Sequence, residues 1–203
     1  MLNQKRLRCF VGFLAILLPW LGALLLWQFP PSISSTYYTY EAGPVFMIIL
    51  GAASILLMYY DGYDKVDDIL NTITGILGMC ICLFPCNHDT LQYVGTFCTP
   101  VAISMWIHNI AAVLFFVLLA YISFFQFTKT SGEMTKQKKI RNIIYRVCAG
   151  GMLGSFLILL LPEFYIQTWL VEAIALFFFG ISWLTKADAF AFLAADPKEA
   201  THD

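Results

Sequence analysis

Six apolar stretches alternate with short polar segments along the chain, and none of them alternates polar and apolar residues with a period of two. An apolar run of about 17–25 residues can cross a bilayer as a helix, whereas an outer-membrane barrel needs period-two strands. The pattern therefore predicts an all-α, polytopic membrane protein, a bundle of six transmembrane helices in a single domain over residues 1–203. The predicted helices cover residues 9–28, 44–60, 69–85, 100–127, 147–161 and 168–185.

Composition supports a membrane environment. Of the 203 residues, 60% are hydrophobic and only 12% are charged, while about 25% of the residues in a soluble domain are charged. The predicted helices leave no room for a separate soluble domain. The net charge of -1 does not favour a nucleic-acid partner. Because the predicted helices lie in a bilayer, the expected partner is membrane lipid.

Basic residues are confined to alternate connections. The loops 29–43, 86–99 and 162–167 contain no lysine or arginine. Because cytoplasmic segments are enriched in basic residues, both termini are expected in the cytoplasm, with the protein in a plasma or inner membrane. The first stretch lacks a small-residue cleavage site and is longer than a signal core, so we interpret it as a retained helix. The basic residues are Lys5, Arg6, Arg8, Lys65, Lys129, Lys136, Lys138, Lys139, Arg141, Arg146, Lys186 and Lys198.

Two ionisable side chains, His108 and Glu172, fall inside the fourth and sixth predicted helices. Both helices enter from the outer face, and ionisable groups at membrane depth usually face the protein interior or a watery cavity. His108, its neighbour Asn109 and Glu172 are therefore candidates for ligand binding, and His108 and Glu172 for catalysis. A His–Glu pair can move a proton, bind a metal or position a lipid headgroup. The alternative is that the fourth helix protrudes and His108 lies in the headgroup layer without a special role.

The first outer loop, residues 29–43, is rich in hydroxyl groups and contains no cation. It can fold over the outer ends of the helices and line a headgroup pocket, which makes Ser34 and Tyr37 binding candidates. A plain extracytoplasmic connector is the alternative.

Cys86 and Cys98 both lie on the second outer loop. A disulfide is one interpretation, because an oxidising face favours it. Two free thiols, or a metal site with His88 and Asp89, are the others. The irregular spacing is a weak metal signal, so no metal is expected.

Other signatures of metal or cofactor binding are weak or absent. Asp61, Asp64, Asp67 and Asp68 surround one cytoplasmic connection, where helix capping explains them more simply than a Mg²⁺ or Ca²⁺ site. The Walker lysine loop, the GxSxG elbow, the HExxH motif and the dinucleotide fingerprint do not occur. No cofactor is expected, and whether the protein is an enzyme stays open.

Four short motifs follow one another along the chain: Pro31-x-Ile33-Ser34 with Pro44 and Phe46; Asn71 with Gly75 and Gly78; His108 with Ala111, Ala112 and Phe115; and Glu172 with Asp188 and Phe190. In this order, the chain resembles the Frag/DRAM/Sfk group of six-helix membrane proteins, and it is similar in plan to uncharacterised bacterial six-helix proteins. The group includes factors that remodel GPI-anchor lipids and damage-regulated autophagy modulators. The outer loop departs from the family, with Tyr37-Tyr38-Thr39-Tyr40-Glu41 where a Gly-Thr and acidic pattern is frequent.

Three functions are consistent with these features. The first is lipid binding or remodelling at an outer-leaflet pocket, with His108 as proton carrier or headgroup donor and Glu172 as its charge partner. The second is a small transporter or proton-coupled channel that uses the same pair as a relay. The third is a non-catalytic scaffold or assembly factor. Gly150 and Gly154 have the GxxxG spacing of close helix contacts, which suits packing within the bundle or a homo-oligomer.

Overall fold

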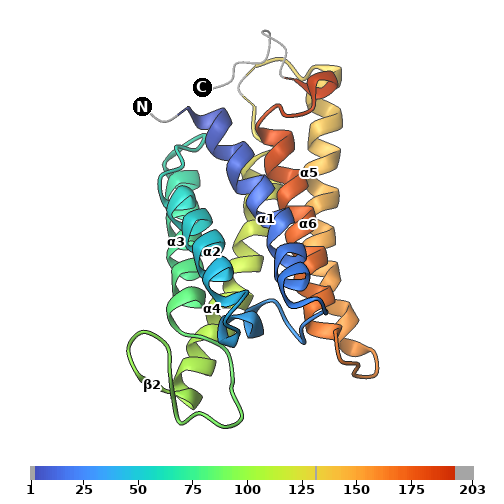
Figure 1. Ribbon diagram of the computed structural model, residues 1–203. Helices are drawn as coiled ribbons and strands as arrows, with labels where there is room; N and C mark the ends of the chain where they lie inside the picture. Colours follow the sequence, from blue (N-terminus) through green and yellow to red (C-terminus); the bar gives the residue numbers. More distant parts are fainter. Residues whose placement is uncertain (1–2, 131, 195–203) are drawn as a thin grey trace.

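The computed structural model describes residues 3–130 and 132–194. It contains six α-helices, each of which packs against the next in sequence, and the last packs against the first (Figure 1). The prediction of an all-helical bundle is confirmed. The helices are α1 (Gln4–Leu26), α2 (Gly43–Met58), α3 (Lys65–Leu83), α4 (Val101–Tyr121), α5 (Lys136–Gly154) and α6 (Gln167–Lys186).

Five helical segments are long and apolar enough to span a membrane, which indicates a membrane protein. Three of them are the helices α1, α3 and α6. The other two are α4 and α5, each taken together with a short helical segment of another type that continues it. α4 runs on as a π-helix, Ile122–Gln126, and α5 as a 3-10 helix, Ser155–Leu160. α2 has only 16 residues, which is short of the roughly 20 that a span requires.

Polar capping residues explain why several helices begin before the predicted apolar stretches. The side chain of Asn3 accepts a hydrogen bond from the backbone N–H of Arg6, at the start of α1. Asp64 caps α3 and Thr135 caps α5 in the same way, since such caps satisfy otherwise unpaired N–H groups. α5 therefore begins at Lys136, within the basic segment that precedes the predicted fifth helix. Hydropathy marks where a helix becomes apolar, which is not where it begins.

Small residues bring α1 and α6 into close contact. A Cβ atom added at Gly180 would lie 2.7 Å from the carbonyl oxygen of Gly12, and one added at Gly12 would lie 3.0 Å from that of Gly180. Any side chain at either position would push the two backbones apart. The glycines therefore permit the contact that closes the ring of helices.

The two ends of the bundle differ in charge. One end, called the loop end below, consists of residues 27–42, 84–100 and 161–166 and contains no lysine or arginine. The opposite end, called the basic end, holds the start of α1, the end of α6 and the other two connections (Figure 1). The basic residues predicted to be cytoplasmic belong to this half, except Lys198, which lies outside the described residues.

Two of the three connections at the loop end contain secondary structure. A 3-10 helix, η1 (Ser34–Tyr38), lies next to the first turn of α2. Two short antiparallel strands, β1 (Tyr93–Val94) and β2 (Thr99–Pro100), precede α4. α4 extends past η1 at this end (Figure 1). The first connection thus covers the end of the short α2 and does not project beyond α4. Of the two interpretations of loop 29–43, folding over the helix ends is the one that the structure shows.

Candidate functional site

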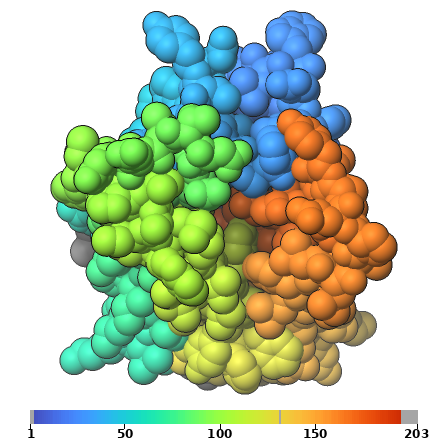
Figure 2. Space-filling model, turned by 90° about the horizontal axis from the view of Figure 1, so that it is seen from below, coloured from blue at the N-terminus to red at the C-terminus, as the bar shows by residue number. Residues whose placement is uncertain are grey.

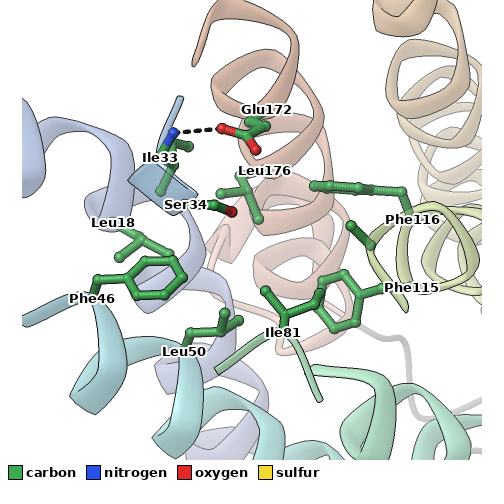
Figure 3. Close-up of a pocket in the computed structure, with 11 residues that line it drawn as sticks. Leu18, Ile33, Ser34, Phe46, Leu50, Ile81, Phe115, Phe116, Glu172 and Leu176 are labelled. Atoms are coloured by element: carbon green, nitrogen blue, oxygen red, sulfur yellow. Dashed lines mark hydrogen bonds between the residues drawn. The ribbon is translucent and has the colours of Figure 1, made fainter. Parts of the chain in front are cut away.

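A cavity lies in the centre of the bundle at the loop end. Figure 2 looks onto this end and shows a hollow between the green and orange segments, and Figure 3 shows the side chains that line it. The space open to the centres of water molecules is about 40 Å³, room for roughly three waters at about 10–15 Å³ each. Its lining is apolar except at two side chains, Ser34 and Glu172. The lining residues are Leu18, Ile33, Ser34, Phe46, Leu50, Ile81, Ala112, Phe115, Phe116, Glu172 and Leu176.

Ser34, the first residue of η1, connects the cavity to His108. The Nε2 atom of His108 lies 3.1 Å from the hydroxyl oxygen of Ser34. Both side chains are buried, with 8% of Ser34 and 4% of His108 exposed. Ser34 lines the cavity and His108 does not, so the imidazole is joined to the cavity wall through the Ser34 hydroxyl.

A backbone carbonyl fixes the orientation of the His108 ring. The Nδ1 atom lies 2.9 Å from the carbonyl oxygen of Phe84, the residue that ends α3. A carbonyl oxygen only accepts hydrogen bonds, so Nδ1 must carry a proton and donate it. One turn earlier on α4, the hydroxyl of Ser104 donates to the carbonyl of Pro85 at 2.8 Å. α4 therefore satisfies carbonyl groups at the end of α3 that have no partner in their own helix.

Glu172, in the second turn of α6, holds the backbone next to Ser34. Its carboxylate oxygen Oε2 accepts a hydrogen bond of 2.5 Å from the backbone N–H of Ile33 (Figure 3), and both Glu172 and Ser34 line the cavity. The backbone N–H of Trp169 donates to the carbonyl of Pro31 at 3.0 Å. The start of α6 thus fixes residues 31–34. Glu172 is half-buried because one side of it faces the cavity.

Three polar side chains meet at this wall of the cavity, and we call them the polar chain (Glu172, Ser34 and His108): His108 bonds the Ser34 hydroxyl, and Glu172 bonds the backbone of the preceding residue, Ile33. The proton on Nδ1 leaves Nε2 of a neutral imidazole as an acceptor, so the Ser34 hydroxyl donates to His108. The hydroxyl at the cavity wall is therefore bonded to a group that can act as a base.

Of the five predicted binding residues, Ser34 and Glu172 line the cavity and His108 contacts Ser34, whereas Asn109 and Tyr37 do neither. Asn109 follows His108 on α4 but is exposed on the outer surface of that helix. Tyr37 is half-buried and packs edge-on against Tyr38, with ring centroids 5.1 Å apart. Asn109 is excluded from the cavity because consecutive helical residues point about 100° apart, and the chain turns away after Ser34 within η1.

Cys86 and Cys98 are both free thiols in the structure, with Cys86 half-buried and Cys98 exposed. Burial raises the pKa of Cys86 to about 12. The backbone carbonyl of Cys86 accepts a hydrogen bond of 2.5 Å from the hydroxyl of Tyr38, so this loop is joined to η1 through its backbone. The disulfide stays a prediction.

No group of three His, Cys, Asp or Glu side chains within residues 3–130 and 132–194 is arranged to hold a metal ion. The aspartates near the start of α3 are used in other ways. Asp64 caps the helix and pairs with Lys129 at 2.6 Å, and this hydrogen bond keeps the pKa of the Asp64 carboxyl below its ordinary value. Asp67 accepts from the backbone of Tyr63 and from the amide of Asn71. Capping and loop formation therefore account for these carboxylates.

Gly150 and Gly154 do not pack within the bundle. A Cβ atom added at either position would meet nothing within 4 Å, whereas one at Gly151 would collide with the ring of Phe178 on α6. Of the two interpretations given for Gly150 and Gly154, packing within the bundle is wrong, because Gly151 and not these two glycines faces α6; the homo-oligomer stays a prediction. Their shared face is open to a second helix.

Sequence reasoning missed the backbone groups that complete the site. The carbonyl of Phe84 and the N–H of Ile33 leave no residue signature, because every residue carries such groups. The spacing of Ser104 and His108, one turn apart on α4, was the available signal that this face of the helix binds polar groups.

The fold and the cavity define a helical membrane protein with a polar chain at one end of an apolar space. Comparison with known proteins gave no match to a family model, to a curated protein or to a solved structure. The resemblance to the Frag/DRAM/Sfk group therefore stays a prediction.

Proposed function

We propose that this protein binds a membrane lipid in the cavity at the loop end, with part of an acyl chain against the apolar lining and a polar group of the lipid against Ser34 and Glu172. The observation that carries the proposal is that the polar chain ends at a cavity whose other lining side chains are all apolar. Binding pockets typically combine such a lining with a few oriented polar groups.

The size of the cavity limits what it encloses. A space of about 40 Å³ holds only a small part of a lipid, so the remainder lies in the hollow seen in Figure 2 or outside the bundle. The part that reaches Ser34 is therefore the junction between the acyl chain and the headgroup, where ester and amide carbonyl groups occur.

The charges around the cavity determine which polar group of a lipid can bind there. The loop end contains no lysine or arginine, and Glu172 lies on the cavity wall. A phosphate placed against these side chains would find no cation and would be repelled by an ionised Glu172. An uncharged carbonyl or hydroxyl group meets neither penalty. The lipid is thus recognised through a neutral group beside its chain.

The charge difference between the two ends gives the orientation that we propose. Basic residues favour the cytoplasmic side of a membrane, so the basic end faces the cytoplasm and both termini lie there. The loop end then faces outward, and the cavity serves the outer leaflet of a plasma or inner membrane. The resemblance to a family with lipid-remodelling members supports the same assignment.

The structure does not favour the relay across the membrane that a transporter needs. Between His108 and Ser123 the buried face of α4 is entirely apolar. At about 1.5 Å per residue, these 15 positions correspond to roughly 22 Å. A buried pair, Ser123 and Ser182 with oxygens 2.7 Å apart, lies beyond this layer. The polar chain is therefore a local site.

Native mass spectrometry of the detergent-purified protein tests lipid binding. We expect the wild type to retain lipid as a mass adduct and Ala112→Trp, which fills the cavity, to lose it. Val113→Trp is the matched control, because Val113 is next in sequence and 53% exposed on the outer surface. Equal retention of lipid by the wild type and Ala112→Trp would contradict the proposal.

A further inference from the structure

Ser34 differs from the other hydroxyl residues of its loop in what it contacts. The hydroxyl of Ser35 donates to the carbonyl of Ser32 at 2.7 Å, and that of Thr36 donates to the carbonyl of Ile33 at 2.6 Å. Thr39 closes the next turn in the same way. These groups hold the backbone in shape. The Ser34 hydroxyl instead contacts the His108 side chain from α4, and Ser34 lines the cavity.

The contacts of Ser34 are those of an activated nucleophile. A serine becomes nucleophilic when an adjacent base takes its proton and a third group orients that base. Here the base is Nε2 of His108, at 3.1 Å. The orienting group is the carbonyl of Phe84, at 2.9 Å from Nδ1, and it holds the ring in the tautomer that a general base requires.

The position of these groups relative to the cavity fits a reaction with the bound lipid. Ser34 lines the cavity, whose lining is otherwise apolar apart from Glu172, and the Ser34 hydroxyl is bonded to His108. A substrate in that space therefore meets a hydroxyl that already contacts its base. The neutral carbonyl group that the cavity selects is an electrophile of the kind that a serine attacks.

We propose that Ser34 is a nucleophile that accepts the acyl group of an ester lipid, with His108 as its general base. The proposal rests on the lipid-binding function proposed above. It adds a transfer reaction, which makes the protein an acyl hydrolase or acyltransferase of the outer leaflet.

The steps balance without a further reagent except water or an alcohol. The Ser34 oxygen attacks the ester carbonyl carbon, and its proton passes to Nε2 of His108. The bond from that carbon to the alcohol oxygen breaks, and His108 gives the proton to the departing alcohol. A water or a second alcohol then attacks the acyl-serine ester, again losing its proton to His108, and the released Ser34 oxygen takes that proton back. Glu172, which accepts from the backbone N–H of Ile33, positions the segment that carries the nucleophile.

A serine-directed electrophile with a long alkyl chain, an alkyl fluorophosphonate, tests the proposal on the full chain in lipid nanodiscs. We expect a covalent adduct that peptide mass spectrometry locates to Ser34. Ser34→Ala abolishes it, and Ser35→Ala, the matched control, retains it. His108→Asn slows the reaction about 100-fold or more, the usual contribution of a general base, while its amide still donates to the Phe84 carbonyl.

The outcomes separate the two proposals. An adduct on Ser34 whose rate depends on His108 supports the nucleophile. Retained lipid in native mass spectrometry together with an unmodified Ser34 overturns the nucleophile and leaves lipid binding standing. An adduct that forms equally fast in His108→Asn overturns the role of His108. Thermal unfolding of each variant shows that the fold is intact, and release of fatty acid from a diacyl phospholipid in the same nanodiscs measures the complete reaction.

Discussion

His108 and Ser34 lie 74 positions apart in the sequence, and the imidazole Nε2 of one is 3.1 Å from the hydroxyl oxygen of the other. The contact joins α4 to the loop that covers the end of α2. It also places a titratable ring in contact with the hydroxyl of a cavity-lining residue. Structure and chemistry at this end of the bundle therefore depend on the same two side chains.

His108 has separable structural and chemical roles. Asn at position 108 places an amide donor near the position of Nδ1, whereas Ala leaves the Phe84 carbonyl without its partner. We expect His108→Ala to cost about 1–3 kcal/mol, or roughly 2–12 °C in Tm for a chain of this size, and His108→Asn to cost less. Thermal unfolding in detergent measures both. Equal losses in the two variants would contradict the structural role of the Phe84 hydrogen bond.

Glu172 holds the loop through one backbone group. Glu172→Gln keeps an oxygen that accepts from the Ile33 N–H, while Glu172→Leu leaves this N–H unpaired. We expect Leu to destabilise the protein by about 1–3 kcal/mol and Gln to be close to the wild type. Limited proteolysis of residues 29–43 provides the measurement, with faster cleavage in the Leu variant only. Unchanged cleavage in Glu172→Leu would show that the loop is held by other contacts.

The two cysteines at the loop end report the orientation of the protein. Cys98 is exposed, whereas burial raises the pKa of Cys86 to about 12, against an ordinary value of about 8.5. Because the thiolate is the reactive form, a membrane-impermeant maleimide applied to intact cells near pH 8 should label Cys98 and leave Cys86 unmodified.

The control is Cys98→Ser, which should remove the labelling. Labelling that appears only after a reductant is added would establish the predicted disulfide. Labelling that requires permeabilised cells would instead place the loop end in the cytoplasm, opposite to the orientation proposed.

The three glycines of α5 should respond differently to substitution. Gly151→Ala introduces a methyl group against the ring of Phe178, whereas Gly150→Ala meets open space. We expect Gly151→Ala to lower Tm and Gly150→Ala to leave it unchanged or raise it, since Ala is favoured over Gly in a helix by about 0.5–1 kcal/mol.

Larger substitutions test the predicted homo-oligomer. Gly150→Leu combined with Gly154→Leu should reduce the mass measured by light scattering from that of an oligomer to that of a monomer, without loss of Tm. A wild type that is already monomeric in detergent and in nanodiscs would exclude this use of the GxxxG face.

Apolar stretches were sufficient to predict the helices because burying polar backbone in lipid leaves few alternatives to a helix. The same signal misplaced the helix starts at Gln4, Lys65 and Lys136, since capping depends on single polar residues outside the apolar run.

Part of the site was equally predictable. His108 and Glu172 are conspicuous because ionisable groups in apolar helices are costly. Sequence suggested that they pair with each other, whereas in the structure His108 bonds Ser34 and Glu172 bonds the backbone of Ile33. Which side chains meet depends on how each helix is rotated about its axis. A helix that is apolar on both faces gives no signal of which face is buried, so the exposure of Asn109 was not predictable.

The central claim, that the cavity at the loop end holds part of a lipid, is tested most directly by photocrosslinking. A phospholipid with a diazirine on its acyl chain near the ester would be incorporated into nanodiscs with the full chain and illuminated. Peptide mass spectrometry should then find label on cavity residues such as Phe116 and Leu176, and Ala112→Trp should remove it while Val113→Trp does not. Label confined to exposed surface residues, and unaffected by Ala112→Trp, would contradict the account.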